Sequence, residues 1–518
     1  MMTKNLLTTV GMVALMITQA LAINVTELQK PELNKVVIKI RFENGSISDP
    51  KGKEGLTYLT SELINEIGTQ NISKSEIDDM VYTMAIERNS FTDKEITTFT
   101  YQVHVDFLDQ FYPVIRGLLL EPNFTTEDFE RVKSNQLNYV DQLIRASSDE
   151  EYSKMALEDL LFRGTNYQHM TAGNTEGVSA ITLEDVKEHF KNYFTRNNVS
   201  LGIAGNYSPD FLNKVVADLE QLPDVTPEIP EPATADMPDG IEVEIVSKEN
   251  ALGSAIYGGY PLDITRASDE FAALMVANSY IGEHRKSYGQ LYQKIREQRS
   301  MNYGDYTYIE WYEKGGWFQL PLTGTPRHSN YFSLWIRPVQ IKDQLVDQYP
   351  ELEGINVGHA HFALRMALSQ IDKLIQNGMS QEDFEVTRQF LRSYIKLYVQ
   401  TPAKELGFLM DSKFYGRENY IREMDALLAQ LTVDDVNAAI KKYLQVNNMY
   451  ITIITDDSEA EPLAESLKSN MPSPMSYSNA LKEILSPEIL AEDEKVKEYQ
   501  LNISEVTVVP DEETFELQ

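Results

Sequence analysis

The chain has 518 residues, with 46 Lys+Arg against 79 Asp+Glu, seven His and no Cys. This length allows about two to four domains, and 42% hydrophobic with 24% charged residues is typical of a globular protein. The lack of Cys excludes disulfides, iron–sulfur clusters and cysteine nucleophiles. A formal charge of −33 argues against a nucleic-acid partner, because such proteins need a basic surface to displace counterions.

Residues 1–22 are predicted to be a signal peptide. Lys4 precedes an apolar stretch, and Ala20-Leu21-Ala22 forms an A-x-A cleavage site. The apolar stretch is shorter than the ~20 residues that a membrane span needs, so we expect an exported protein without a membrane span. The expected compartment is the periplasm, and Asn-x-Ser/Thr sites such as Asn24 keep a secreted protein open as the alternative.

The rest of the chain contains two copies of one unit. Residues 127–130 (Glu-Asp-Phe-Glu) recur at 382–385, an offset of 255, each time after a Thr or Ser that can cap a helix. Residues 182–186 recur at 432–436, an offset of 250, and each copy then leads to a strand-like run. This order and spacing predict a duplicated domain.

Composition sets the boundaries of the two units. Residues 224–240 are acidic, Pro-rich and without apolar period, which indicates a linker. The units are therefore expected at 23–223 and 241–470, with a C-terminal tail at 471–518 that could add a strand through residues 503–509 or lie along the surface. Strand-like runs such as 36–41 and 95–103 alternate with long amphipathic helices, so each unit is predicted to be α+β, a mixed sheet covered by helices.

A helical pattern after the first strand contains Gly55-Leu56-Thr-Tyr58-Leu-Thr-Ser61-Glu62. The spacing i, i+3, i+4 places Tyr58, Ser61 and Glu62 on one helical face. This segment resembles the H-x-x-E-H motif of the insulinase/pitrilysin (inverzincin) zinc metallopeptidases, and the resemblance extends over nearly the whole mature chain. It implies two tandem domains of that family.

The zinc chemistry of the family is expected to be missing. A catalytic zinc needs three protein donors such as His2Glu and a carboxylate that takes a proton from the bound water. Tyr58 and Ser61 stand where the family has its first His and its Glu base, and Glu62 stands for the second His. The third ligand would fall near Asn138 or Tyr139, and neither is a carboxylate. We therefore expect no metal or other cofactor in this chain.

The resemblance also implies residues that bind substrate. Arg296 and Tyr303 have the seven-residue separation of the Arg/Tyr pair that family members carry in their distal domain, where it contacts peptide carbonyls and the developing oxyanion. Residues Asn89, Ser90, Phe91 and Thr92 match a strand edge that the family pairs with an extended peptide. Without the resemblance, Arg296 and Tyr303 would be an exposed Arg and a core Tyr, and residues 89–92 an ordinary edge strand guarded by Lys94 and Glu95.

Other candidate sites have little support. His359 and His361 are two residues apart on a predicted helix, so they point to different faces and are expected to be a surface pair. Nucleotide-binding and α/β-hydrolase motifs do not occur in the sequence.

These features predict a non-catalytic subunit of a heterodimer. The resemblance implies a zinc-bearing homologous peptidase subunit as partner, a peptide as substrate, and peptidase activity only with the partner chain. The alternatives are a structural or peptide-binding homologue with no part in proteolysis, or an active metallopeptidase whose ligands are misaligned.

Overall fold

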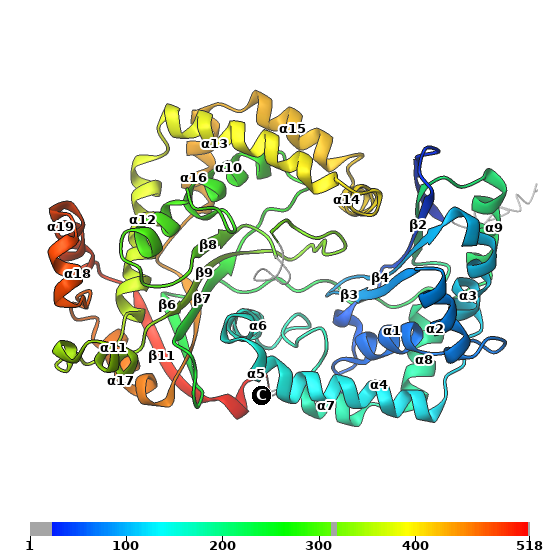
Figure 1. Ribbon diagram of the computed structural model, residues 1–518, viewed down its shortest axis with the longest axis horizontal. Helices are drawn as coiled ribbons and strands as arrows, with labels where there is room; N and C mark the ends of the chain where they lie inside the picture. The colour runs from blue at the N-terminus through cyan, green and yellow to red at the C-terminus, as the bar shows by residue number, and fades with distance from the viewer. Residues whose placement is uncertain (1–22, 312–318, 516–518) are drawn as a thin grey trace, which may run out of the picture.

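The computed structural model describes residues 23–311 and 319–515, and the predicted signal peptide lies outside this part of the chain. The described residues form two β-sheets, each packed against its own set of helices (Figure 1).

The two sheets have the same strand order. The first is ordered β1-β5-β2-β4-β3 and the second β11-β6-β10-β7-β9-β8, so the two orders correspond strand for strand once β11 is set aside. One pair in the first sheet and two in the second are parallel and the others antiparallel, which makes both sheets mixed. The first sheet contains β1 (Asn24–Gln29), β2 (Lys35–Phe42), β3 (Glu87–Thr92), β4 (Thr97–His104) and β5 (Val199–Gly205). The second contains β6 (Ile241–Ser247), β7 (Ser254–Pro261), β8 (Asp305–Tyr308), β9 (Tyr331–Val339), β10 (Met449–Thr455) and β11 (Ile503–Pro510).

Helices make up most of the remaining ordered structure, so the predicted α+β class with two tandem units is confirmed. Those of the first half are α1 (Leu56–Glu66), α2 (Lys74–Thr83), α3 (Leu108–Leu120), α4 (Thr126–Asn138), α5 (Ile144–Ser147), α6 (Asp149–Leu161), α7 (Thr175–Ala180), α8 (Leu183–Tyr193) and α9 (Pro209–Leu219). Those of the second half are α10 (Phe271–Gly282), α11 (Lys342–Gln348), α12 (Ala360–Asn377), α13 (Gln381–Tyr394), α14 (Pro402–Phe414), α15 (Tyr420–Gln430), α16 (Val433–Tyr443), α17 (Asp457–Ser469), α18 (Asn479–Ile484) and α19 (Pro487–Val496).

The repeated sequence motifs start equivalent helices. Thr182 caps α8 and Thr432 caps α16, each in a capping box with the Asp three residues later. The repeated Glu-Asp-Phe-Glu segments likewise open α4 and α13, where Thr125 and Ser380 accept the N3 backbone N–H. The same local chemistry therefore begins the same helices in both units.

Each unit supplies one helix to the other unit's sheet. Side chains alternate across a strand, and on β2 the residues Val36, Ile38 and Ile40 pack against the first unit's own helices. Val37 points the other way, onto Leu406 and Met410 of α14. In the second sheet Tyr257 packs in the same manner on Leu157 and Leu161 of α6. Figure 1 shows α6 and α14 between the two sheets, so the units interlock.

The C-terminal tail belongs structurally to the second sheet. Strand β11 pairs in parallel with β6, outside the strand order that the two sheets share. Beyond β11, Arg145 donates to the Thr514 carbonyl at 2.8 Å, which ties the tail to the first half. Residues 220–240, which include the expected linker, contain no helix or strand.

The predicted surface pair on α12 is wrong. His359 and His361 are 3% and 0% exposed, because residues around α17 and the tail cover this end of the helix. The His359 Nε2 lies 3.0 Å from the Ser476 carbonyl and the His361 Nδ1 lies 2.8 Å from the Ser466 hydroxyl. Burial lowers the pKa of both imidazoles, to about 4 and about 3, so they are neutral packing residues.

Candidate functional site at helix α1 and strand β3

Helix α1 carries Tyr58, Ser61 and Glu62, the three residues that align with the zinc motif. It begins after Gly55, whose φ of +96° is a left-handed conformation. A Cβ at this position would lie 2.5 Å from the Ala172 carbonyl oxygen, so only glycine fits without a shift of the backbone. The turn directs Tyr58 and Glu62 toward a cavity and places Ser61 against strand β3.

Two of the three side chains, Ser61 and Glu62, form hydrogen bonds with the adjacent strand. The Ser61 hydroxyl is fully buried, donates to the Tyr58 carbonyl at 2.9 Å and lies 2.7 Å from the Thr92 hydroxyl. The Glu62 carboxylate accepts a hydrogen bond from the Ser90 hydroxyl at 2.6 Å. These contacts join α1 to β3.

This arrangement does not fit a catalytic zinc ion. Glu62 is the single carboxylate of the three positions, and the buried Ser61 hydroxyl is already bonded within the protein. Across the part of the chain that the structure describes, no group of three or more His, Asp or Glu side chains could hold a metal. A hydroxyl, a phenol and one carboxylate lack the donor set that zinc requires.

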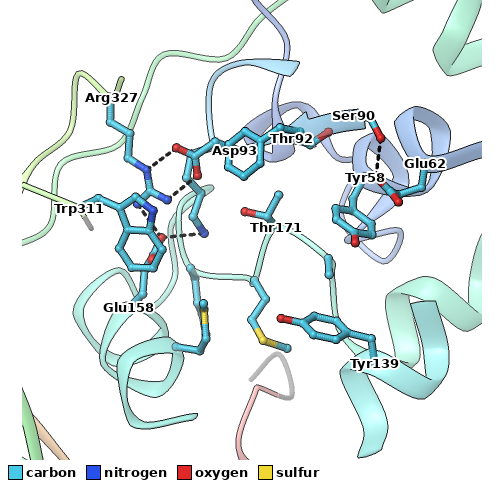
Figure 2. Close-up of a pocket in the computed structure, with 16 residues that line it drawn as sticks. Tyr58, Glu62, Ser90, Thr92, Asp93, Tyr139, Glu158, Thr171, Trp311 and Arg327 are labelled. Carbon is cyan, nitrogen blue, oxygen red and sulfur yellow. Dashed lines mark hydrogen bonds and ion pairs between the residues drawn. The ribbon is translucent and has the colours of Figure 1, made fainter. Parts of the chain in front are cut away.

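A cavity of about 340 Å³ lies beside α1 (Figure 2). Tyr58 and Glu62 line it together with Tyr139, which is the first residue of a π-helical segment after α4. Of the two residues expected near the third ligand position, Tyr139 lines the cavity and Asn138 does not. The lining also contains Met155, Met170, Thr171 and Trp311, so apolar and aromatic side chains share the cavity wall with polar and charged ones.

Strand β3 forms one rim of this cavity and is the edge of the first sheet. Of the predicted peptide-binding residues, Ser90, Phe91 and Thr92 line the cavity, and Asn89 lines a second one on the other face of the sheet. The Asp93 N–H donates to the Ile96 carbonyl at 2.9 Å, which sets the alternation of the β3–β4 ladder. By that alternation the N–H groups of Ser90 and Thr92 face the open edge, away from β4.

A buried ion-pair network closes the cavity on the side of the second unit (Figure 2). Arg327 donates to Asp93 at 2.6 and 2.9 Å and to Glu158 at 3.0 Å, and Lys94 lies 3.1 Å from Glu158. The Arg327 guanidinium also lies over the Trp311 ring, 4.4 Å from its centroid. The network joins the β3–β4 turn, α6 and the segment before β9, so it fixes the end of β3.

The two cations of the network keep the buried Glu158 carboxylate ionised. Burial alone would raise the pKa of the Glu158 carboxyl, but Arg327 and Lys94 outweigh burial and lower that pKa. Lys94 and Glu95 are 1% and 6% exposed, so they do not guard the strand edge as an ordinary edge strand would require. The sequence showed no local spacing that could have revealed these contacts, since Arg327 lies more than 150 residues from both carboxylates.

The Arg/Tyr pair lies apart from this cavity. Arg296 is in a π-helical segment, Tyr292–Glu297, and is half exposed with an ion pair to the adjacent Glu297 at 2.7 Å. Tyr303 is 76% exposed, so it is not a core residue. The Arg337 guanidinium lies 5.9 Å from the Tyr303 ring centroid. The structure therefore places Arg296 and Tyr303 at the surface and does not bring them to Tyr58 and Glu62.

Comparison with known proteins identifies the family. The family model described as insulinase (peptidase family M16) matches residues 25–175, and the model described as peptidase M16 inactive domain matches residues 180–333. Together they match more than half of the chain.

Several curated proteins are related to the chain. A "non-peptidase homolog YmxG" of Helicobacter pylori is 22% identical over 427 residues, 81% of this chain and 88% of that protein. An "uncharacterized zinc protease" of Streptomyces coelicolor is 19% identical over 424 residues, 80% and 83% of the two chains. A mitochondrial-processing peptidase subunit beta of Caenorhabditis elegans is 20% identical over 256 residues, 49% and 54% of the two chains.

The fold agrees with these matches. A crystal structure of a peptidase M16 inactive domain from Pseudomonas fluorescens superimposes with a TM-score of 0.70 at 17% identity, covering 83% of this chain and 95% of that one. Within the described residues no helix is both long and apolar enough to cross a membrane. The relatives called non-peptidase and inactive fit a non-catalytic role. The chain belongs to the insulinase family, peptidase family M16, as a protein of two tandem M16 units.

Proposed function

We propose that this chain is a non-catalytic M16 subunit that holds an extended peptide on β3 and acts with a zinc-bearing homologous partner. The observation that carries the proposal is the open edge of β3 beside a cavity lined by Tyr58 and Glu62, two of the three residues aligned with the zinc motif. Zinc would be held by the partner. The proposed compartment is the periplasm, with secretion as the alternative, as the sequence of residues 1–22 suggests.

Backbone pairing supports the peptide-holding role. A peptide added to β3 would bond to the outward groups of Ser90 and Thr92, which gives affinity without a specific side-chain code. Its alternate side chains would point to the two faces of the sheet. One face has the 340 Å³ cavity and the other a cavity of about 450 Å³, so both rows of side chains have space.

The exposed Arg/Tyr pair supports the need for a partner. Arg296 and Tyr303 are carbonyl-binding types of side chain, a permanent cation and a phenol. Because they lie at the surface and outside the cavity lining, they would serve a peptide bound in another subunit. One relative is by its name the beta subunit of a mitochondrial-processing peptidase.

A proline substitution tests peptide holding. Ser90→Pro removes the N–H that faces the open edge, whereas Ser90→Ala removes only the hydroxyl bond to Glu62 and keeps that N–H. Binding of unstructured fluorescent peptides, followed by anisotropy, should weaken about tenfold or more in Ser90→Pro, as loss of a hydrogen bond of about 1.4 kcal/mol implies. Equal affinity of the Pro and Ala variants would contradict pairing at this edge.

Reconstitution tests the partnership. The full chain is purified alone and with an H-x-x-E-H homologue from the same organism, and peptide cleavage is measured. Arg296→Ala and Tyr303→Phe should each lower kcat of the pair by about ten- to a hundredfold. This is at or below the roughly 10²–10³-fold loss caused by removing one oxyanion-hole donor. Zinc-dependent cleavage by the chain alone would overturn the proposal.

A second candidate is a structural or peptide-binding homologue with no part in proteolysis, which the name of the Helicobacter pylori relative favours. It predicts that the H-x-x-E-H homologue cleaves peptides at the same rate with and without this chain. An active metallopeptidase, as the name of the Streptomyces coelicolor relative suggests for that protein, predicts stoichiometric zinc in the pure chain by elemental analysis.

A further inference from the structure

The face of the first sheet opposite to α1 contains a second cavity, of about 450 Å³. It lies between the sheet, helix α14 and residues 322–324 of the second unit. Its walls are mostly polar side chains of β2, β3 and β4 with two lysines, and the lining residues are Lys39, Glu87, Arg88, Asn89, Phe91, Thr98, Thr100, Gln102, Leu322, Thr323, Gly324, Ala403 and Lys404.

Lys39 is the buried cation of this cavity. It lies in the centre of β2, is 9% exposed, and donates to the Thr100 hydroxyl at 3.3 Å. Within residues 23–311 and 319–515, no carboxylate lies within 4.0 Å of its ammonium group. Buried charges in proteins are ordinarily paired, so this ammonium lacks the partner that its location calls for.

The nearest carboxylates are already engaged. Asp411 of α14 accepts from the Arg41 guanidinium at 2.5 Å and from the Gly324 N–H at 2.9 Å. Lys39, Arg41 and Asp411 therefore form a buried cluster with one positive charge in excess. Burial and the neighbouring Arg41 lower the pKa of Lys39 to about 8, with Asp411 opposing them, so most of the lysine remains charged at pH 7.

The rim of the cavity adds to the positive charge. Lys404 also has no carboxylate within 4.0 Å among the described residues. The one carboxylate of the lining, Glu87, is bound to Lys35 at 3.5 Å and to Gln102. Hydroxyl and amide groups of Thr98, Thr100 and Asn89 supply further donors. A cationic polar cavity of this kind stands out in a chain of net charge −33.

In the second sheet, the position equivalent to Lys39 is occupied by an aromatic side chain that packs against a helix. Lys39 pairs with Gly202 of β5, and the equivalent residue of β10, Thr452, pairs with Tyr257. Tyr257 is 3% exposed and packs on α6. The first unit thus has a charged residue and a cavity where the second has an aromatic ring and a helix.

We propose that this back-face cavity binds a carboxylate, with Lys39 as its counter-ion and Lys404 at the rim. The carboxylate is that of a small organic acid, or that of an acidic side chain or C-terminus of a peptide lying along β3. The small-acid form of the site is independent of the function proposed above.

Chemical labelling of Lys39 tests the site in the full mature chain. Acetic anhydride is applied at pH 7, with and without succinate, and acetylation of the peptide that contains Lys39 is measured by mass spectrometry. A bound carboxylate shields the amine and raises its pKa, so labelling should fall about tenfold or more, the effect of about one pKa unit. Succinamide, and chloride at equal ionic strength, should leave the acetylation of Lys39 unchanged. Acetylation of the remote Lys482 should not respond to succinate.

Variants separate the sources of the carboxylate. Succinate should raise the melting temperature of the wild type, because it binds the folded state. Lys39→Met should abolish this rise, and Lys404→Met should weaken it. The ligand is a peptide carboxylate if a Glu-containing peptide protects Lys39 in the wild type and the matching Gln peptide does not. This protection should be lost in Ser90→Pro. Protection by succinate in both proteins identifies a small acid. Labelling of Lys39 that responds to neither succinate nor the Glu peptide, or equally to succinamide, would overturn the proposal.

Discussion

The two sheets of this protein share a strand order but differ at one edge, where the first sheet ends in β3 and the second in β8. In the first sheet this strand is β3, six residues long, with its outer edge beside a cavity. In the second it is β8, four residues long and buried throughout. The comparison shows that the two copies share a framework while an open edge beside a large cavity occurs in the first copy, where the proposed peptide would pair.

The faces of the two sheets that α14 and α6 cover also differ, again with more open space in the first unit. Helix α6 and Tyr257 fill the second sheet's face, whereas α14 covers only part of the first and leaves Lys39 beside a cavity. Both proposed binding surfaces therefore lie in the first unit. The second unit contributes the exposed Arg296 and Tyr303 and the closing residue Arg327.

The largest expected effect comes from breaking the junction between the units. Arg327→Met leaves Asp93 and Glu158 buried with less positive charge around them, so the free energy of unfolding should fall by about 3–5 kcal/mol. Urea unfolding measures it. Arg392→Met, which removes an exposed pair with Asp425, is the matched control and should change stability by less than about 1 kcal/mol. Similar losses in both variants would contradict the role of Arg327.

Lys39→Met should stabilise the protein at pH 7 by about 1–3 kcal/mol, because it removes a buried ammonium that lacks a carboxylate. The folded pKa of about 8 lies below the unfolded value of about 10.4. The cost of the charge is therefore fully present below pH 8 and disappears as pH rises to about 10.4, and the gain should disappear with it. Thermal unfolding from pH 7 to 10 measures this, and a destabilised variant at pH 7 would be inconsistent with an uncompensated charge.

Matched caps provide a direct comparison of the two units. Thr182→Ala and Thr432→Ala remove the same capping box from α8 and α16, where the Asp N–H to Thr hydroxyl distance is 3.2 Å in each. Each should lower the unfolding free energy by about 1 kcal/mol. Denaturant titrations of both variants should agree within about 0.5 kcal/mol, and a larger gap would show that the repeats are not energetically equivalent.

The smallest effect concerns His328, whose Nδ1 lies 2.6 Å from the Glu95 carboxylate across the junction. The bond to Glu95 raises the pKa of His328, burial opposes it, and the charges of Glu95, Glu43 and Glu231 add to it. Stability from this contact is present below the unfolded pKa of about 6.5 and is lost as pH rises through the higher folded value. Because the side chain is 58% exposed, the change should stay below about 1 kcal/mol. Unfolding of His328→Gln from pH 5 to 9 should lack this decline.

The sequence revealed the framework because its signals are local. The caps at Thr125 and Ser380 depend on neighbouring residues, so they can be recognised from spacing alone. The helical spacing of Tyr58 and Glu62 likewise placed both at one cavity.

The ion-pair network, the burial of the two histidines and the cavity beside Lys39 depend on contacts between residues that are distant in sequence. Arg327 meets Asp93 across 234 positions, and Arg41 meets Asp411 across 370. His359 and His361 were predicted to be exposed because nothing near them in sequence shows that residues 466 and 476 cover that end of α12. The cavity beside Lys39 exists only because α14 covers part of the sheet.

The exchange of α6 and α14 between the units sets the order in which the chain can fold. The first sheet exposes Val37 and Ala204 until residues 402–414 have been synthesised, and the second sheet receives β11 only from the last residues of the chain. The first half therefore cannot cover this face of its sheet until most of the second half has been made. Produced as separate fragments, the halves would each expose side chains that the other half's helix buries, Val37 and Ala204 in the first and Tyr257 in the second.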